Sequence, residues 1–227
     1  MKRCMRQGKS HMSPTMTCCW VKMRLSRLHL GLLILFVSSL GLTPSQSYPM
    51  GIGESADGGC LCHGSASNTT EISLIGVPTL FESNQTFNLT LEINSSIDVH
   101  SENAQGGFRL LVSAGTIEFE NETQVQNLDA GWTHTSEGNT HRWWNFTWTA
   151  PEDNTSAVEI IAHGNAVNGN QNQFDDAWNS YGITIPGSSF EGTIIQLNLN
   201  QSYSLIDYSI IIGGIIAILG FLYFAIK

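Results

Sequence analysis

Residues 144–149, Trp-Asn-Phe-Thr-Trp-Thr, decide the fold class of this chain. Large apolar side chains at every second position alternate with Asn and Thr, which is the two-residue period of a strand with one buried face. Aromatic and β-branched residues are also enriched in strands. The stretch therefore predicts a strand that sends its Trp and Phe side chains into a core.

The same two-residue period recurs on both sides of this stretch. Alternating apolar residues occupy 87–93, 108–112, 117–119, 158–162 and 195–199, and turns rich in Gly, Asn and Pro separate them. No helical period interrupts the series, so we expect an all-β ectodomain, an antiparallel Ig-like β-sandwich spanning residues 71–204. We expect the Asn/Gly-rich stretch 164–181 to be an irregular loop.

The N-terminus has the pattern of a secretory signal. Arg24 and Arg27 precede the apolar run LGLLILFV at residues 30–37, and small residues lead to a cleavage site before Tyr48. Met23 heads this pattern, so we interpret residues 1–22 as a mis-annotated extension and residues 23–47 as the signal peptide. The alternative is a cytoplasmic tail in front of a signal anchor.

The C-terminus has the pattern of a transmembrane helix. Residues 209–226 are eighteen uncharged residues, about 27 Å as a helix, and residues 205–208 extend the span. Tyr203 and Tyr208 suit an outer aromatic belt, and Lys227 suits the inner side. We expect residues 205–227 to anchor a single-pass cell-membrane protein with an extracellular ectodomain and a cytoplasmic C-terminus.

The expected ectodomain is strongly acidic. Between Tyr48 and Ser204, eighteen Asp and Glu residues face only Arg109 and Arg142, a balance of −16. Nucleic-acid binding relies on Lys and Arg contacts to phosphate, so this composition excludes a nucleic-acid partner. It suits a soluble domain whose self-repulsion is screened in salty water.

N-x-S/T sequons are dense in the same region and predict a glycoprotein. Two of them fall on the outward positions of predicted strands, as a glycan requires. The eight acceptor asparagines are Asn68, Asn84, Asn88, Asn94, Asn121, Asn145, Asn154 and Asn200.

Of the five cysteines, only Cys60 and Cys62 follow the leader, inside a Gly/Ser/Asp-rich segment, residues 48–70, that we interpret as a loop. With His63 they form a C-x-C-H group. Covalent attachment of haem c uses C-x-x-C-H, in which the His binds the iron, and this spacer is one residue shorter. Zinc or copper bound by the same three residues, a Cys60–Cys62 disulfide, and inert thiols without any cofactor are the alternatives.

Several segments in fixed order resemble a known family. They are the C-x-C-H group, Gly107-Phe108, Trp132-Thr-His134-Thr, Trp148-Thr-Ala-Pro151 and the run from His163 to Gly169. Over residues 50–181 the chain resembles reelin-type (Reeler-like) β-sandwich domains, in particular the prokaryotic surface proteins called choice-of-anchor V, and the sequons favour an archaeal member. The resemblance implies a surface location and an Ig-like sandwich, with C-x-C-H as a variant of the C-x-x-C-H segment of that group.

Further ligands for a metal or haem iron must come from elsewhere in the ectodomain. His134, in a motif shared with the family, is the first choice as a second iron or metal ligand, and His163 is the next. The remaining candidates are Met50, His100 and His141. Asp175 and Asp176, with nearby Asn side chains, have the oxygen chemistry of a calcium site.

Two functions follow from these observations. The first is surface electron transfer by a haem held at Cys60, Cys62 and His63, with an unidentified redox partner. The second is a non-enzymatic adhesion or ligand-binding module in which the C-x-C-H loop is structural. The chain contains no G-x-S-x-G segment, and its histidines lack a nucleophile signature, so we expect no enzymatic activity.

Overall fold

A computed structural model describes residues 48–98, 104–170, 174–195, 197–199 and 204–226. The predicted extension, signal peptide, acceptor Asn200 and candidate ligand His100 lie outside these residues and stay predictions.

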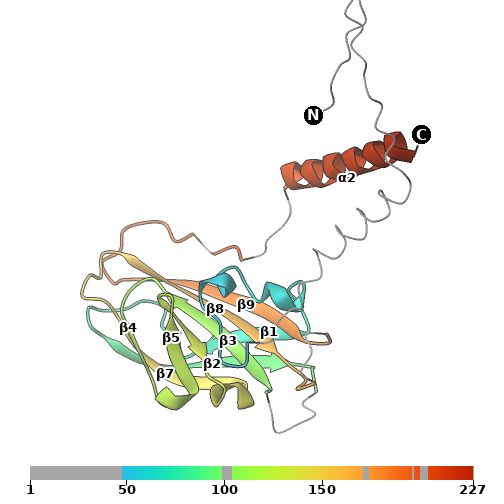
Figure 1. Ribbon diagram of the computed structural model, residues 1–227. Coiled ribbons are helices and arrows are strands. Elements are labelled where there is room, and N and C mark those ends of the chain that lie inside the picture. The colour runs from blue at the N-terminus through green and yellow to red at the C-terminus, as the bar shows by residue number, and fades with distance from the viewer. Residues whose placement is uncertain (1–47, 99–103, 171–173, 196, 200–203, 227) are drawn as a thin grey trace, which may run out of the picture. The chain divides into compact units, whose positions relative to one another are not determined.

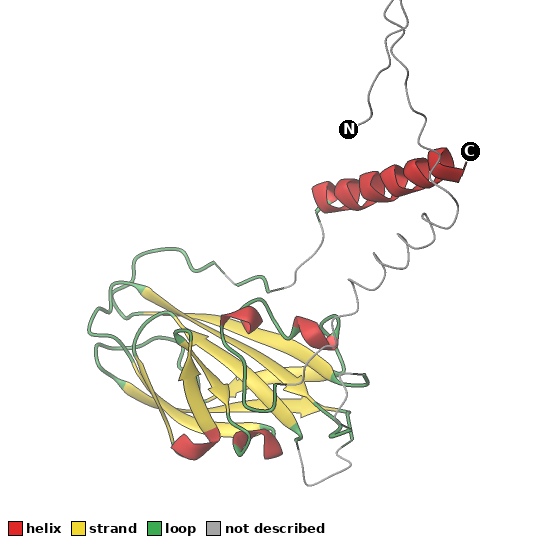
Figure 2. Ribbon diagram, viewed as in Figure 1, coloured by secondary structure: helices red, strands yellow, loops and turns green. Residues whose placement is uncertain are grey.

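The described part of the ectodomain consists of antiparallel strands joined by turns and short 3₁₀ helices (Figure 2). The strands are β1 (Thr70–Ile75), β2 (Thr86–Ser95), β3 (Gly106–Val112), β4 (Thr116–Phe119), β5 (Val125–Leu128), β6 (Gly131–His134), β7 (Trp143–Thr149), β8 (Ala157–Ala166) and β9 (Ala177–Pro186). The 3₁₀ helices are η1 (Glu54–Ala56), η2 (Leu61–His63), η3 (Glu122–Gln124) and η4 (Gly138–Thr140).

The strands form two sheets, in the orders β1-β2-β7-β4 and β5-β6-β3-β8-β9. Every pair within these sheets is antiparallel, and the sheets pack face to face as a sandwich (Figure 1). This confirms the predicted fold class. We call the second sheet the five-stranded sheet. Its outer face carries the candidate site.

The core forms where the inward residues of the two sheets meet. Trp144, Phe146 and Trp148 of β7 are buried, as their alternation predicts. The Phe108 ring of β3, in the opposite sheet, lies 4.6 Å from the Trp144 ring, centroid to centroid. Aromatic pairs at this separation stabilise a core beyond the area they bury.

Two details of the predicted strand pattern are wrong. The stretch 164–181 is not one irregular loop, because it contains the end of β8 and the start of β9. The described residues of 195–199 form no strand. Their alternation has another cause, since the Leu197 and Leu199 side chains pack over Gly182 of β9.

Residues Leu205–Ile226 form the helix α2. Its segment Leu205–Tyr223 has a mean hydropathy of 2.3, and among the described residues it is the one helix long and apolar enough to cross a membrane. The predicted C-terminal span is thus confirmed as an apolar helix of sufficient length.

Candidate functional site

The segment 48–67 lies across the outer face of the five-stranded sheet and carries the C-x-C-H group. Its two 3₁₀ helices, cyan in Figure 1, lie over β8 and β9. A row of polar side chains projects from the sheet beneath it, from Thr133 through Arg109 and His163 to Ser180, which are neighbours in the strand register. The sheet thus offers the segment hydrogen-bond partners instead of an apolar surface.

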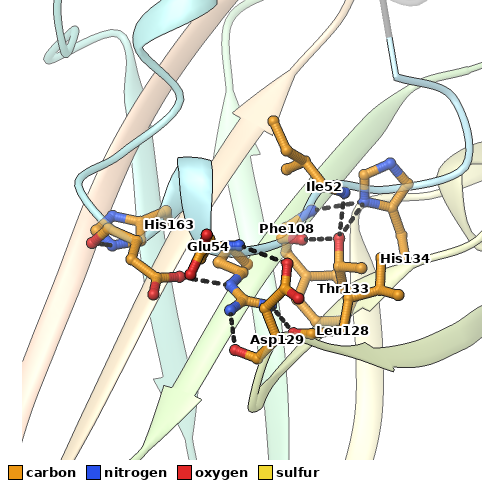
Figure 3. Close-up of polar contacts among 10 residues, drawn as sticks. Ile52, Glu54, Phe108, Leu128, Asp129, Thr133, His134 and His163 are labelled. Carbon is orange, nitrogen blue, oxygen red and sulfur yellow. Dashed lines mark hydrogen bonds and ion pairs between the residues drawn. The ribbon is translucent and has the colours of Figure 1, made fainter.

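Arg109 binds the centre of the segment 48–67 to the five-stranded sheet. Its side chain has no solvent exposure, and its Nε donates to Asp57 Oδ1 at 2.7 Å. The two Nη groups donate to the carbonyls of Leu128 at 2.6 Å and Asp129 at 2.9 Å (Figure 3). A buried guanidinium needs such partners, because an unpaired buried charge is strongly unfavourable.

His163 also binds the segment 48–67 to the sheet. Its Nε2 donates to the Asp57 carbonyl at 2.9 Å, so the neutral ring accepts at Nδ1 from the Ser180 hydroxyl, 2.6 Å away. Burial lowers the pKa of His163, although the Asp57 carbonyl opposes this shift. Both ring nitrogens therefore serve the packing of the segment, and a metal-ligand role would require breaking one of these bonds.

His134 fastens the start of the segment. Its Nδ1 accepts from the Phe108 backbone N–H at 3.1 Å, and its ring makes a further backbone hydrogen bond with Tyr48. The ring lies against Gly107, where a Cβ would collide with it. Burial lowers the pKa of His134 to about 4, so the ring is neutral at pH 7. This environment is that of a structural histidine.

The C-x-C-H loop is wrapped around one tryptophan. Trp178 Nε1 donates to the Gly64 carbonyl at 2.9 Å, and the six-membered part of its ring lies against Gly59. Gly59 has a φ of 113°, and a Cβ there would collide with the indole. Glycine at this position follows from both the backbone conformation and the close contact.

The two cysteines have different environments. Both are free thiols; Cys60 is half-buried and Cys62 is exposed. Burial raises the pKa of the Cys60 thiol to about 12, and the charge on Cys62 adds to this shift. Because metals bind thiolates, zinc or copper would have to displace this proton to bind Cys60.

His63 is the one member of the group with a strong polar partner. Its Nδ1 donates to Asp176 Oδ2 at 3.0 Å, and Asp176, at 3% exposure, is almost fully buried. Asp176 Oδ1 also accepts from the Asn168 backbone N–H at 3.2 Å. A carboxylate on one ring nitrogen fixes the tautomer and orients the other nitrogen, which is the usual arrangement around a metal-bound histidine.

Asp176 has a compensating charge nearby. The Arg142 guanidinium donates to the carbonyls of Gln105, Ile97 and Val167, and its charge interacts with that of Asp176. Burial lowers the pKa of Arg142, and Asp176 acts in the opposite direction. Asp176 thus contacts His63 and has a basic group nearby.

Of the predicted ligands, His100 lies outside the described residues. No group of three or more His, Cys, Asp and Glu side chains in the described part of the chain is arranged to hold a metal ion. A haem fits the observed residues only in part. Nε2 of His63, which has 22% exposed side-chain surface, suits an axial iron ligand, and Cys62 suits one thioether.

The residues that sequence reasoning missed are Asp57, Arg109, Asp176 as the partner of His63, and Trp178. One signal was present for Arg109, because it stands at an outward position of a predicted strand in a domain with only two basic residues. Asp57 and Asp176 carry no local signal, since their partners are 52 and 113 residues away in the chain.

The predicted glycan acceptors differ in accessibility. Asn145 and Asn154 are half-buried, and their Nδ2 groups donate to Glu120 Oε2 at 2.8 Å and to Ser188 Oγ at 2.9 Å. The other acceptors that the structure describes are exposed, namely Asn68, Asn84, Asn88, Asn94 and Asn121.

Comparison with known proteins finds similar solved structures only. No family model and no curated protein matches the chain. The reelin-N domain of F-spondin is 19% identical, with a TM-score of 0.34, over 44% of this chain and 73% of that domain. A conjugative transposon lipoprotein from Bacteroides eggerthii is 13% identical, with a TM-score of 0.33, over 56% of this chain and all of that chain.

A third similar structure is AvmM, which catalyses macrocyclization in alchivemycin A biosynthesis. It is 10% identical, with a TM-score of 0.35, over 62% of this chain and 94% of that one. Reeler domains, which the sequence resembles, are thus among the structures found. Similarity at this level assigns neither a family nor an activity, and it leaves the expected absence of enzymatic activity a prediction.

Proposed function

We propose that this chain is a membrane-anchored extracellular module that holds a c-type haem at the C-x-C-H group, Cys60, Cys62 and His63, and passes electrons at the cell surface. The contact between His63 Nδ1 and the buried Asp176 carboxylate carries this proposal. A bound haem supplies one-electron transfer, and the residues of the loop hold it and set its environment.

In this function His63 would hold the haem iron through Nε2. Asp176 holds the ring in the tautomer that leaves Nε2 without a proton, and the carboxylate makes the imidazole a stronger electron donor. Trp178 fixes the loop from below through its bond to the Gly64 carbonyl. His134 and His163 are already hydrogen-bonded within the sandwich, so they do not enter this site.

The test is a visible absorption spectrum and an intact mass of the full chain, expressed with a cytochrome maturation system and purified in detergent. We expect a Soret band and a haem-sized mass increase. Both disappear in His63→Ala and persist in His141→Ala, the matched control. A wild-type protein that is folded and colourless contradicts the proposal.

Asp176→Asn tests the role of the carboxylate separately. The amide keeps an acceptor for His63 but removes the charge, so we expect haem to be retained and its reduction potential to rise. An unchanged potential means that Asp176 serves the fold alone.

A non-enzymatic adhesion or ligand-binding module is the second candidate. It is favoured by the way the C-x-C-H loop closes over Trp178, because a loop held in this way can serve stability alone. In this function, replacing both Cys60 and Cys62 by Ser leaves surface binding intact. Loss of binding in the double variant, with the fold preserved, argues against a purely structural loop.

A further inference from the structure

The C-x-C spacing and the local helix separate the two thiols. Cys62 lies in the middle of η2 (Leu61–His63), and Cys60 is the residue immediately before this helix. Cys60 is the N-cap and has non-helical backbone angles (φ −81°, ψ 52°), so its side chain does not follow the direction that the helix sets for Cys62. In C-x-x-C-H the thiols are three positions apart and return to the same side of a helical turn.

Burial agrees with this separation. Cys62 is exposed, whereas Cys60 is half-buried. Gly59, its neighbour in the chain, is pressed against the indole of Trp178. Cys60 therefore follows directly on a backbone position held close to the indole.

We propose that Cys62 alone attaches the haem and that Cys60 stays a free thiol within the loop. This inference rests on the proposed function and specifies its covalent chemistry. The S–H bond of Cys62 adds across one vinyl group: sulfur bonds the inner vinyl carbon, the proton ends on the outer carbon, and the double bond becomes single. No electrons are gained or lost, and the second vinyl group stays intact.

The surroundings of His63 suit attachment of the haem through a single thioether. Leu61, next to Cys62, is 57% exposed, and Phe174, two residues before Asp176, is 65% exposed. Both side chains lie on the chain segments that meet at the His63–Asp176 contact. A porphyrin held at Cys62 offers them an apolar surface, which holds the macrocycle without a second thioether.

The experiment counts thiols and haem in the full chain in detergent. Reduced protein is incubated with ferrous haem, and a second sample comes from expression with a cytochrome maturation system. Non-covalent haem is extracted with acidified acetone, and the denatured protein is alkylated with iodoacetamide and mapped by peptide mass. We expect one covalent haem on the peptide of Cys62 and full alkylation of Cys60.

Two single variants complete the test. Cys60→Ser keeps the covalent haem yield within about twofold of wild type, and Cys62→Ser abolishes it. In the pyridine haemochrome spectrum the wild type has its band at a longer wavelength than a two-thioether haem, because one vinyl group stays conjugated. Haem on Cys60, or on both cysteines, overturns this inference and leaves the proposed function standing. Absence of any bound haem in folded wild-type protein overturns both.

Discussion

Arg109 and Asp57 form an ion pair, 2.7 Å between Nε and Oδ1, that joins the middle strand of the five-stranded sheet to the segment carrying the C-x-C-H group. Arg109 is fully buried, whereas Asp57 retains 41% of its side-chain exposure. The two partners therefore differ in what their removal leaves behind. Without Arg109, the carbonyls of Leu128 and Asp129 lose their donors, but without the Asp57 charge the guanidinium keeps both carbonyl partners.

We therefore expect Arg109→Met to cost about 3 kcal/mol of unfolding free energy, because three hydrogen bonds from a charged group are lost. Asp57→Asn keeps an acceptor for Nε and should cost about 1 kcal/mol or less, because a partly exposed pair is screened. Urea unfolding followed by tryptophan fluorescence measures both, since all but one of the six Trp residues lie after the leader. Equal losses would show that the charge pair, and not the buried donors, matters.

Acid should destabilise the sandwich through His134. Its pKa is about 4 in the folded protein and near its ordinary 6.5 in the unfolded chain, so the unfolded chain binds the proton first as the pH falls. The neutral ring stabilises the fold fully above pH 6.5, and this contribution, about 3 kcal/mol, is lost between pH 6.5 and about 4. Unfolding free energies measured at pH 7.5 and pH 4.5 check the direction and size.

His134→Gln is the control for that prediction. Glutamine supplies both an acceptor and a donor but does not titrate in this range. We expect a smaller difference between the two pH values in this variant. Some difference remains, because burial also lowers the pKa values of His163 and His141. A pH dependence identical to that of the wild type would show that His134 is not the group responsible.

The loop offers a matched pair of glycines. Gly59 and Gly64 both have positive φ, 113° and 90°, but a Cβ at Gly59 collides with Trp178, whereas a Cβ at Gly64 meets no atom within 4 Å. Gly64→Ala should cost about 1 kcal/mol from backbone strain alone, and Gly59→Ala clearly more. Hydrogen exchange of the amides of residues 59–67 reports this order. A similar cost for both would show that the indole contact yields easily.

Part of this fold follows from sequence because its period is local. The alternation at 144–149 identifies a strand and its buried face at once, and Trp144, Phe146 and Trp148 are buried accordingly. The same reasoning fails at 195–199, where Leu197 and Leu199 alternate but pack over Gly182 without pairing as a strand. Alternation indicates which side chains contact an apolar surface. A segment that packs over a sheet without pairing as a strand contacts such a surface with every second side chain too.

The candidate site was predictable only as a motif. Its spacing identifies Cys60, Cys62 and His63 but says nothing of which thiol faces solvent. It also does not identify Asp176, whose contact with His63 depends on how β9 begins beside the loop. His134 and His163 were the natural choices for further ligands, yet their rings make backbone hydrogen bonds with Tyr48 and Asp57 of the segment 48–67. The sequence alone cannot distinguish a histidine that binds a metal from one that forms structural hydrogen bonds, because both roles place the ring near a polar atom.

The anchor prediction depends on α2. A chain ending after Ser204 lacks the apolar helix Leu205–Ile226 and should be secreted in soluble form, because the rest of the described surface belongs to an acidic sandwich. Fractionation after a high-salt wash measures this. Recovery of the truncated chain with the membrane would show that another segment holds it there, and the full-length chain is the control.

The last prediction concerns which sequons are used. Asn88 and Asn145 lie on the outer face of the β1-β2-β7-β4 sheet as diagonal neighbours, since Asn88 pairs with Thr147 and Thr90 pairs with Asn145. Diagonal positions are about 7–8 Å apart, too close for two branched glycans to be added freely. Asn88 is exposed, but the Nδ2 that would bond the sugar at Asn145 donates to Glu120.

In a host that glycosylates folded sequons we expect high occupancy at Asn88 and low occupancy at Asn145, read by peptide mass after enzymatic deglycosylation in heavy-oxygen water. Glu120→Ala frees the Asn145 amide, so combined with Asn88→Gln it should raise occupancy at Asn145. Full occupancy of both sites in the wild type would mean that sugar is added before the sheet forms.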